Sequence, residues 1–355
     1  MNKYIIQFKP MGPYFFGMEN RKVSQENINT DEANYFLKSS KFPQQSTILG
    51  AIRFFFLQNV CPENVFNDNQ ILDRDSAKDY IGAKSFDINE TAFNFGRIKG
   101  ISEVFLRNNN SNYLPLPFDK WSSDFGDLKQ VDGTSFYFLP NYDVKKHYPM
   151  IFTNGSKQVS IDDIFLEHIQ SGNKKNNKGD DDDDAFYKQQ YWRLKEGWAF
   201  ATELETDFEF NTSDQSYFMP MGGENRLFKI DILDNDFNRV QILRNEKSQS
   251  VVKVLLTSDA YLKKDIAQYK PIFSILQTKS FRYLSSELAK TTQYQNRSKD
   301  QKSMVASHML EIIDRGSIFY FDNVEKATSF VLEHFPNDYL SKTGFNQNII
   351  ITNQN

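Results

Sequence analysis

The stretch FPQQSTILGAIR, from Phe42 to Arg53, predicts where the first helix of this chain begins and how it packs. Its proline ends an extended segment, and a helix is expected from Ser46 or Thr47 to about Asn59, with the Ser46 hydroxyl as N-cap. Backbone N–H groups at such a helix start, together with Arg53, suit the binding of a phosphate chain. The apolar residues recur at helical spacing and predict one buried face, formed by Ile48, Leu49, Ile52, Phe55 and Phe56.

A second informative stretch, MGGENRLF, runs from Met221 to Phe228. Its glycine pair allows positive φ angles and a close approach of the backbone to a neighbour. Asn225 and Arg226 can then donate to phosphate oxygens or base edges. Glu224 would repel phosphate and is better placed to hold Arg226 or a neighbouring loop. A tight turn between two strands is the alternative, because the glycine pair alone would satisfy it.

The rest of the chain predicts many strands and few helices, an order that favours an α+β fold over a doubly wound parallel sheet. Tyr4–Phe8 alternates as a first strand, while Ile161–Ile169, capped by Ser160, and Ala327–Phe335 are expected to be helices. Met304–Ile313 is compatible with a strand or a helix, and the remaining C-terminal residues are expected to have modest order. Further strands are expected at Phe86–Phe105, Tyr113–Phe118, Ser135–Leu139, Ala185–Arg193, Trp198–Phe210, Arg226–Leu233, Val251–Ser258, Ile272–Ile275 and Gly316–Phe321.

Size and charge limit the classes of function. The chain has 355 residues, enough for two domains, and a net charge of −4. Nucleic-acid binders that act alone are usually basic, so this charge counts against a protein that coats RNA or DNA by itself, although it allows a local basic groove. The longest apolar run, Ile48–Val60, is too short and too polar to span a bilayer, and the first residues do not resemble a signal peptide. One cysteine, Cys61, fits the reducing cytoplasm.

The sequence gives little support for a metal site or a catalytic centre. The four histidines lack zinc-ligand spacing, and no nucleophile elbow or phosphate-binding P-loop motif occurs. The acidic stretch Gly172–Asp184 is expected to be a solvated loop, since its adjacent aspartates lack the ligand spacing of a calcium loop. Lys145–His147 could in principle support metal-free RNA cleavage, with His147 as base, but an exposed loop before Tyr148 is the simpler interpretation. No cofactor is expected.

One strand candidate, AFYKQQYWR at Ala185–Arg193, interleaves aromatic residues with cations. Such a pattern suits the stacking of bases and the neutralisation of phosphates. A strand edge with a mixed face is the alternative.

These motifs together resemble the RAMP family, the RNA-binding subunits of CRISPR effector complexes. FPQQSTILGAIR is similar to the family's (F/L)PPxxTxxGAxR helix start, with Gln44 in place of the second proline, and MGGENR is similar to its GGExR signature. Gly316–Phe321, GSIFYF, resembles the late glycine-strand motif, and the opening strand with PYFFGMENR fits the first strand and aromatic loop. Within the family, the third subunit of the type III-B (Cmr) complex is the most similar.

The resemblance implies two ferredoxin-like (RRM-like) domains with antiparallel sheets and long inserted loops. We expect an N-terminal domain at residues 1–155, an insertion with the acidic loop at 156–188, and a C-terminal domain with the glycine-rich loop at 189–345. The resemblance further implies a non-catalytic subunit that holds the 5′ tag of the crRNA. Such a subunit would bridge the large polymerase-cyclase subunit to the backbone RAMP subunits in a cytoplasmic ribonucleoprotein. A metal-free endoribonuclease that matures guide RNA and a protein-only scaffold remain the alternatives.

The residues expected to contact RNA come from two sources. Those that match the family motifs are Gln45, Ser46, Thr47, Arg53, Gly222, Gly223, Asn225 and Arg226. Those added from their charge and position are Arg21, Lys38 and Lys41, and Lys188 is added from the interleaved strand candidate.

Overall fold

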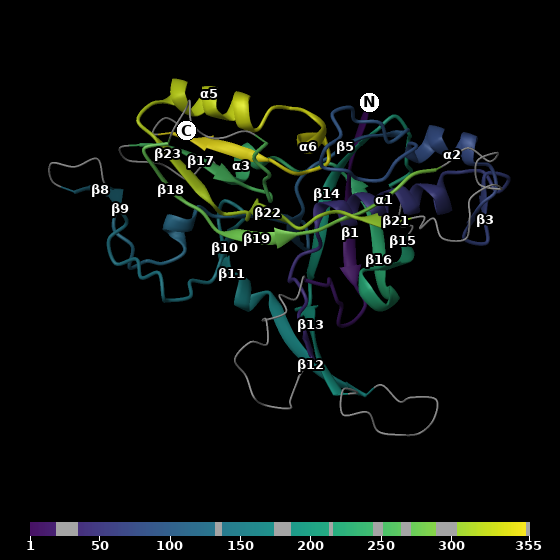
Figure 1. The fold of residues 1–355 in the computed structure, drawn as a ribbon, viewed down its shortest axis with the longest axis horizontal. Helices are drawn as coiled ribbons and strands as arrows, with labels where there is room; N and C mark the ends of the chain where they lie inside the picture. The colour runs from purple at the N-terminus through teal and green to yellow at the C-terminus, as the bar shows by residue number, and fades with distance from the viewer. Residues whose placement is uncertain are drawn as a thin grey trace.

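The fold was analysed in a computed structural model, which describes residues 1–18, 35–131, 137–173, 186–212, 216–243, 251–263, 271–288 and 304–352. It is a mixed α+β fold with mostly antiparallel sheets and few helices, as predicted (Figure 1). Among the described residues, no helix is both long and apolar enough to cross a membrane.

The larger sheet has nine strands and is centred on β1 (Asn2–Pro10), which lies between β14 (Trp198–Thr206) and β16 (Arg226–Asp234). Both neighbours are antiparallel to β1, and Ile6 lies opposite Thr202 of β14. β6 also pairs antiparallel with β14, so β1 and β6 are parallel with β14 between them. The other strands of this sheet are β5 (Ile98–Ile101), β6 (Phe105–Asn108), β7 (Ser111–Pro115), β10 (Ile151–Thr153), β11 (Gln158–Ser160) and β15 (Ser216–Met221).

Helix α1 (Gln45–Asn59) follows β1 and begins one residue before the expected start. The carbonyl of Gln44 accepts hydrogen bonds from the N–H groups of Thr47 and Ile48, at 3.0 and 3.1 Å, so Gln44 is the N-cap residue. The prediction of Ser46 as N-cap is therefore wrong, because Ser46 already lies inside the first turn. The buried face is as expected and includes Phe55, whose ring packs edge-on against Tyr217 of β15 at 5.0 Å.

The predicted helix at Ile161–Ile169 is wrong. Ser160 accepts from the N–H of Asp162 as a cap would, but only a 3-10 turn follows at Ile161–Asp163. The chain then enters β12 (Phe165–Asn173), which pairs along its whole length with β13 (Phe186–Leu194). A complete partner strand satisfies more backbone groups than a short helix would, so the tertiary pairing overrides the local signal.

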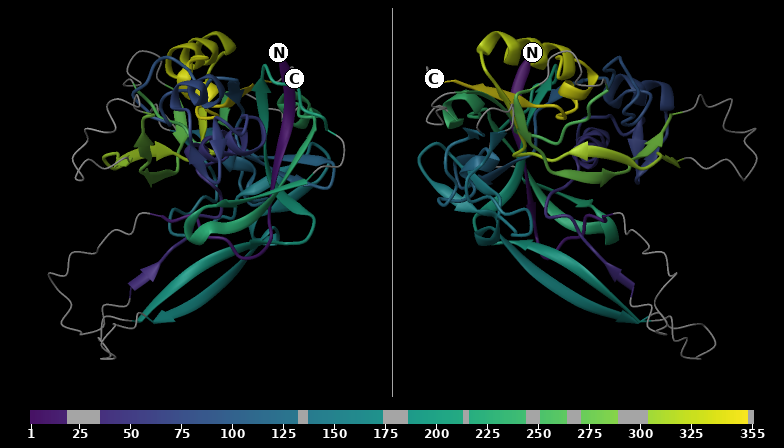
Figure 2. Two further views of the ribbon diagram at one scale, coloured as in Figure 1. Left: turned by 90° about the vertical axis from the view of Figure 1, so that its right-hand side faces the viewer. Right: turned by 60° about the vertical axis from the view of Figure 1, so that its left-hand side comes forward.

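These two strands form an arm that projects from the body of the molecule, and both views of Figure 2 show it. A short strand, β2 (Tyr35–Leu37), pairs parallel with β13. The predicted domain division between residues 188 and 189 falls within β13, and β14 and β16 beyond it pair with β1. The domain limits stay a prediction.

A second sheet has four strands in the order β18 (Phe273–Ile275), β23 (Ile318–Phe321), β17 (Val252–Leu256) and β24 (Asn348–Ile351). β23 and β24 both pair antiparallel with β17, and α5 (Val324–His334) connects them above the sheet (Figure 1). The C-terminal segment up to residue 352 is better ordered than the modest order expected for it, since β24 pairs with β17 and Phe345 is fully buried.

The smaller elements complete the structure. Met304–Ile313 forms two strands rather than a helix. The helix at Arg74–Ile81 was not expected. The smaller elements outside the sheets described above are β3 (Phe66–Asn67), β4 (Gln70–Ile71), α2 (Arg74–Ile81), a 3-10 turn at Phe118–Lys120, β8 (Lys129–Gln130), β9 (Tyr137–Phe138), a 3-10 turn at Gly223–Asn225, α3 (Arg239–Leu243), β19 (Thr278–Phe281), β20 (Leu284–Ser286), β21 (Met304–Ala306), β22 (Leu310–Ile313) and α6 (Tyr339–Lys342).

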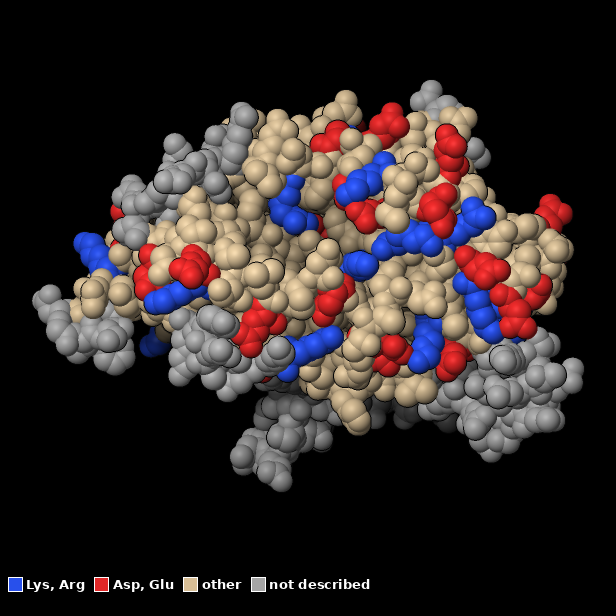
Figure 3. Space-filling model, turned by 90° about the horizontal axis from the view of Figure 1, so that it is seen from above, with Lys and Arg blue, Asp and Glu red and all other residues tan. Residues whose placement is uncertain are grey.

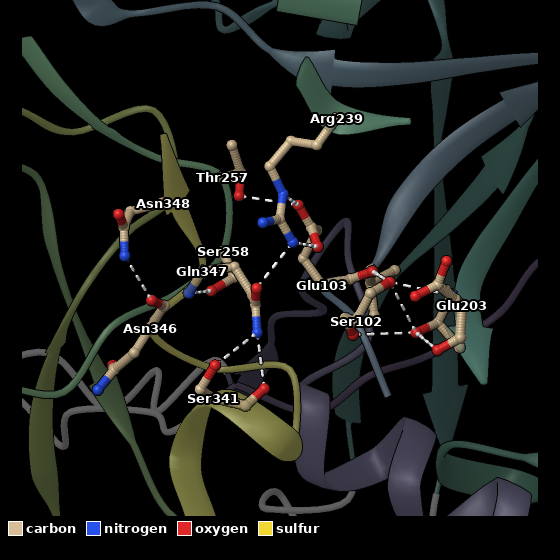
Figure 4. Close-up of polar contacts among 12 residues, drawn as sticks. Ser102, Glu103, Glu203, Arg239, Thr257, Ser258, Ser341, Asn346, Gln347 and Asn348 are labelled. Carbon is tan, nitrogen blue, oxygen red and sulfur yellow. Dashed lines mark hydrogen bonds and ion pairs between the residues drawn. The ribbon is translucent and has the colours of Figure 1, made fainter. Parts of the chain in front are cut away.

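A buried carboxylate joins the two sheets (Figure 4). Glu103, fully buried, accepts two hydrogen bonds from the guanidinium of Arg239, both at 2.6 Å, and one from the Thr257 hydroxyl at 2.8 Å. Arg239 also donates to Gln347, which precedes β24. Burial alone would raise the pKa of Glu103, but the Arg239 charge and these hydrogen bonds lower it below its ordinary value.

Candidate nucleic-acid interface

A groove with a volume of about 920 Å³ runs along one face of α1. The wall formed by α1 presents residues three or four positions apart, from Ser46 through Gly50 and Arg53 to Leu57. The floor comes from the segment between Ile81 and Phe86. The opposite wall belongs to the C-terminal half, and α2 and the β3–β4 hairpin close one end. The complete lining is Gly17, Gln44, Ser46, Thr47, Gly50, Arg53, Phe54, Leu57, Asn69, Gln70, Ile71, Arg74, Ile81, Ser85, Phe86, Arg282, Tyr283, Leu284, Ser286, Glu287 and Leu288.

Hydrogen bonds fix the walls of this groove to its floor. The Nε of Arg53 donates to the carbonyl of Ile81 at 2.9 Å, which ties α1 to the floor. On the other side, the N–H of Ser85 donates to the carbonyl of Ser286 at 2.8 Å, and the Tyr283 hydroxyl donates to Asp87 at 2.7 Å. The groove is thus built from segments more than 200 residues apart.

Arg53 is the most informative group in the groove. Its side chain is buried, with 9% of the residue exposed, and its guanidinium lies 5.6 Å from the ring centre of Phe95. Burial lowers its pKa to about 10, so it stays charged at neutral pH. Within the described part of the chain no carboxylate pairs with it. A buried cation without a partner anion is unfavourable, and its position in the groove wall suits an anionic ligand.

The start of α1 adds polar groups beside this cation. Ser46 and Thr47 line the groove and are partly exposed, and the Ser46 hydroxyl donates to the Gln44 side chain at 3.4 Å. A Cβ placed on Gly50 would meet no atom within 4 Å, which leaves the helix backbone open between them and Arg53. A phosphate chain can therefore approach the helix closely along this face.

Gln45 lies elsewhere, although it belongs to the same motif. Its side chain is fully buried, where its amide donates to the carbonyl of Ser102 and accepts from the N–H of Val104, both at 3.0 Å. The residue anchors the helix start to the sheet and does not line the groove.

The glycine pair forms the turn between β15 and β16 and also supports a second loop. Gly222 has φ 78°, and a Cβ added there would lie 2.6 Å from the carbonyl oxygen of Phe15. The N–H of Gly223 donates to that same oxygen at 2.9 Å. Both glycines therefore fit the close packing of the aromatic loop at residues 14–18, which agrees with the tight-turn alternative.

Beyond the glycines, Asn225 is exposed with φ 50°, while Arg226 belongs to a polar cluster with Glu224 and Tyr191. Glu224 accepts from Arg226 and from the Tyr191 hydroxyl, each at 2.7 Å, and the guanidinium lies 4.8 Å from the Tyr191 ring centre. The hydrogen bond from Tyr191 is the main cause that lowers the pKa of Glu224. The predicted role of Glu224 in holding Arg226 is confirmed.

The predicted lysines lie along the arm, with Lys41 at its base, Lys38 directly after β2, and Lys188 near the outer end of β13 opposite Ser171. Lys38 is exposed beside Phe36, and Lys188 on β13 is exposed in register with Phe36. Lys41 pairs with Asp162 at 3.1 Å and lies 4.8 Å from the Trp192 ring centre. Arg21 and the aspartate run Asp180–Asp184 lie outside the described residues.

The aromatic loop connects the two groups of residues. Gly17 lines the α1 groove and bridges to Ser39, while Phe15 holds the glycine turn. The two quoted motifs, far apart in sequence, therefore meet on either side of residues 14–18. Seen from above, cations alternate with acidic residues over much of the surface, so a broad basic face is not visible from this side (Figure 3).

Two arginines of the groove, Arg74 and Arg282, escaped the sequence interpretation because neither belongs to a recognisable motif. Arg74 opens helix α2, whose start carries a clear signal. The Asp73 carboxylate caps the helix by accepting from the N–H groups of Asp75 and Ser76, at 3.0 and 3.2 Å. Arg282 has no comparable local signal, since only tertiary packing brings it opposite α1.

The Lys145–His147 segment lies in an exposed loop, as in the simpler interpretation. Lys146 lies over the ring of Tyr148 at 5.6 Å. Within the described residues, no group of three or more His, Cys, Asp and Glu side chains is placed to hold a metal ion.

Comparison with known proteins gives a family match. A family model described as "CRISPR-associated protein (Cas_Cmr3)" matches residues 151–353. Two solved structures share 13% identity and a TM-score of 0.49. They are "Cryo-EM structure of the Type III-B Cmr-beta bound to cognate target RNA", covering 98% of this chain and 96% of that one, and the same complex with AMPPnP in state 1, covering 97% and 96%. A third, "Crystal structure of Csm1-Csm4 cassette in complex with pppApA", has 10% identity, a TM-score of 0.29 and coverage of 89% and 86%. No curated protein matches.

Proposed function

This chain belongs to the CRISPR-associated Cas_Cmr3 family, and we propose on that basis that it is a non-catalytic, RNA-binding subunit of a type III-B CRISPR effector complex. The family inferred from the sequence motifs is confirmed. Its RNA would be the crRNA, held by its 5′ tag.

The buried guanidinium of Arg53 is the observation that carries this proposal. It faces a groove large enough for part of a nucleic-acid strand, and no carboxylate of the described residues neutralises it. A phosphate of the RNA would supply the missing negative charge. Ser46, Thr47 and the open backbone at Gly50 would then contact neighbouring atoms of the strand.

The region around the aromatic loop extends the same RNA path. Lys38 and Lys188 supply exposed cations along the arm, and Asn225 supplies an exposed amide beside the glycine turn. Arg226 is partly exposed even though Glu224 holds it, so it can still approach a phosphate. Together these groups would neutralise the tag backbone after it leaves the α1 groove.

An Arg53→Met variant tests the groove directly. We expect it to bind a fluorescent guide RNA carrying the host's 5′ tag at least about tenfold more weakly, because a charged hydrogen bond contributes about 1.5–3 kcal/mol. Fluorescence anisotropy at fixed salt measures the affinity, and a thermal melting curve checks the fold.

Lys326→Met is the matched control, since it removes one exposed charge, paired with Asp322, far from the groove lining. Arg53→Lys keeps the positive charge and serves as a second variant that can be measured if the Arg53→Met protein does not fold. Unchanged affinity in a folded Arg53→Met protein would remove the groove from the RNA path.

Bridging between other subunits is the second part of the proposal, and an exposed apolar patch supports it. The patch consists of Met11, Phe218 and Leu227, which are 55%, 54% and 49% exposed. Met11 donates its N–H to the carbonyl of Leu227, and Phe218 lies on the neighbouring edge strand β15. Exposed clusters of this kind are typical of protein–protein contacts. The proposed partners are the large polymerase-cyclase subunit and the backbone RAMP subunits.

Phe218→Glu is expected to abolish co-purification with at least one of these partners when the complex is co-expressed, because a charge then lies in an apolar contact. The isolated variant should keep its RNA affinity. Leu332→Glu on α5 is the control, since Leu332 is 70% exposed but lies apart from the patch. Normal assembly of the Phe218 variant would rule out the patch as a contact.

The fold supports the two ferredoxin-like domains that belong to the same proposal. Each sheet contains two parallel strands with one antiparallel strand between them and a helix in the chain that connects the two. In the larger sheet these are β1 and β6 around β14, with α1 in the connection. In the smaller sheet they are β23 and β24 around β17, with α5 in the connection. This split βαβ arrangement is typical of ferredoxin-like folds. A non-catalytic role and a cytoplasmic location complete the proposal.

A further inference from the structure

The end of the groove opposite the start of α1 differs chemically from the rest. It is formed by the β3–β4 hairpin, which presents Asn69, Gln70 and Ile71, and by Arg74 of α2. The helix face from Ser46 to Leu57 rises about 16 Å, so this end lies several ångströms beyond Arg53 along the groove. No motif in the sequence pointed to these residues.

Local geometry fixes this hairpin in one register. Asp68 and Asn69 form its two-residue turn with φ angles of 48° and 59°, as turns that follow the right-handed twist of a hairpin require. The backbone N–H of Asp68 donates to the Asn67 side chain at 2.9 Å. Gln58 near the end of α1 donates to the Asn69 side chain at 3.3 Å, which holds the turn against the helix.

We propose that the β3–β4 hairpin is the base-reading end of the groove, where the amides of Asn69 and Gln70 discriminate the nucleobase of a single-stranded RNA whose phosphates lie along α1. This inference rests on the proposed RNA-binding function. Gln70 offers both donors and an acceptor, and Asn69, whose Oδ1 accepts from Gln58, still offers its two N–H donors. Donors and an acceptor together recognise the edge of a base, whereas a phosphate requires donors alone.

The neighbouring side chains fit a base as well. Phe54, Leu57 and Ile71 line the same end and provide apolar surface against which a flat base can pack. Arg74 supplies a cation for the phosphate attached to that nucleotide. Sequence-specific recognition of RNA acts mainly on unpaired bases, which agrees with a groove for a single strand.

The test separates discrimination from affinity. The probes are fluorescent hexanucleotides of oligo(A), oligo(C) and oligo(U), bound to the full-length protein, and the readout is the ratio of the weakest to the tightest Kd. The variant combines Asn69→Gly, which keeps the positive φ, with Gln70→Met, which keeps the side-chain length. We expect its ratio to fall at least about fivefold, since each amide–base pair contributes about 1–3 kcal/mol of discrimination.

Asn109→Gly is the matched control, because Asn109 is an exposed amide with φ 51° beside a different hairpin, β6–β7. It should leave the ratio unchanged. Two results would overturn the base-reading role and leave RNA binding intact. In the first, the wild-type protein binds all three probes equally. In the second, the variant discriminates as well as the wild type while its binding still depends on Arg53. Binding that ignores Arg53 altogether would instead overturn the proposed function, and the inference with it.

Discussion

Single residues of the first motif divide between the surface and the interior. Gln45 and Ser46 are neighbours, yet Gln45 binds the backbone at Ser102 and Val104 while Ser46 lines the groove. Gly344 packs so tightly against the Gln45 amide, with φ 83°, that a Cβ there would collide with it. Gln45 is therefore a structural residue that holds the helix start at the correct position.

Gln45→Ala is expected to lower the free energy of unfolding by about 2–4 kcal/mol, because it leaves one buried donor and one buried acceptor unsatisfied. Urea unfolding measures the loss. Gln44→Ala is the control, since Gln44 is partly exposed and should cost less than about 1 kcal/mol. Equal effects of the two variants would contradict the structural role of Gln45.

At the scale of elements, α1 combines a buried apolar face with an open groove face. Gly50 lies in the middle of the helix, where glycine is normally unfavourable. The space around it is empty in the structure, so packing does not require a glycine there. An open helix backbone is useful at this point because the groove runs directly over it.

Gly50→Ala is expected to stabilise the protein by about 0.5–1 kcal/mol, since alanine favours the helix, while RNA affinity changes less than about twofold. Gly50→Gln should keep most of that stability but weaken RNA binding at least about tenfold, because its side chain fills the groove. Thermal melting and anisotropy on the same samples measure both effects. Full RNA affinity in a folded Gly50→Gln protein would show that RNA does not pass over this helix.

At the scale of the whole molecule, the groove and the buried Glu103 cluster both depend on contacts between the N-terminal and C-terminal halves. Glu103 follows β5, Arg239 lies on α3, and Thr257 follows β17 (Figure 4). This cluster holds the two sheets together, and the walls of the groove come from the same two halves.

Stability should therefore depend on pH through Glu103. Its folded-state pKa is lowered, so the stabilisation is complete above its ordinary pKa of 4.5 and is lost as the pH falls below that value. Glu103→Gln should cost about 3 kcal/mol at pH 7 because Arg239 loses its partner. The difference from the wild type should shrink as the pH falls below 4.5 in urea unfolding experiments. A difference that stays constant over this range would contradict the role of the Glu103 charge.

Much of the candidate site was visible in the sequence because its signals are local. The helical spacing of apolar residues predicted the buried face of α1, and the glycine pair with Arg226 predicted a turn flanked by donors. The hydroxyls of Ser46 and Thr47 and the cation of Arg53 were named from the same motif. The acidic neighbour Glu224 was correctly expected to hold Arg226, since opposite charges two residues apart in a turn readily meet.

The sequence by itself therefore determined the family, the α+β class, the position of α1 and the chemistry of its motif, because caps, turns and periodicity act over a few residues. The tertiary structure alone decided that 165–173 is a strand, that Gln45 is buried, and that Arg74 and Arg282 share a groove with Arg53. Each of these depends on pairing and packing between segments far apart in the chain. Such contacts are set by the strand order and by the fit of the two halves, which no local pattern encodes.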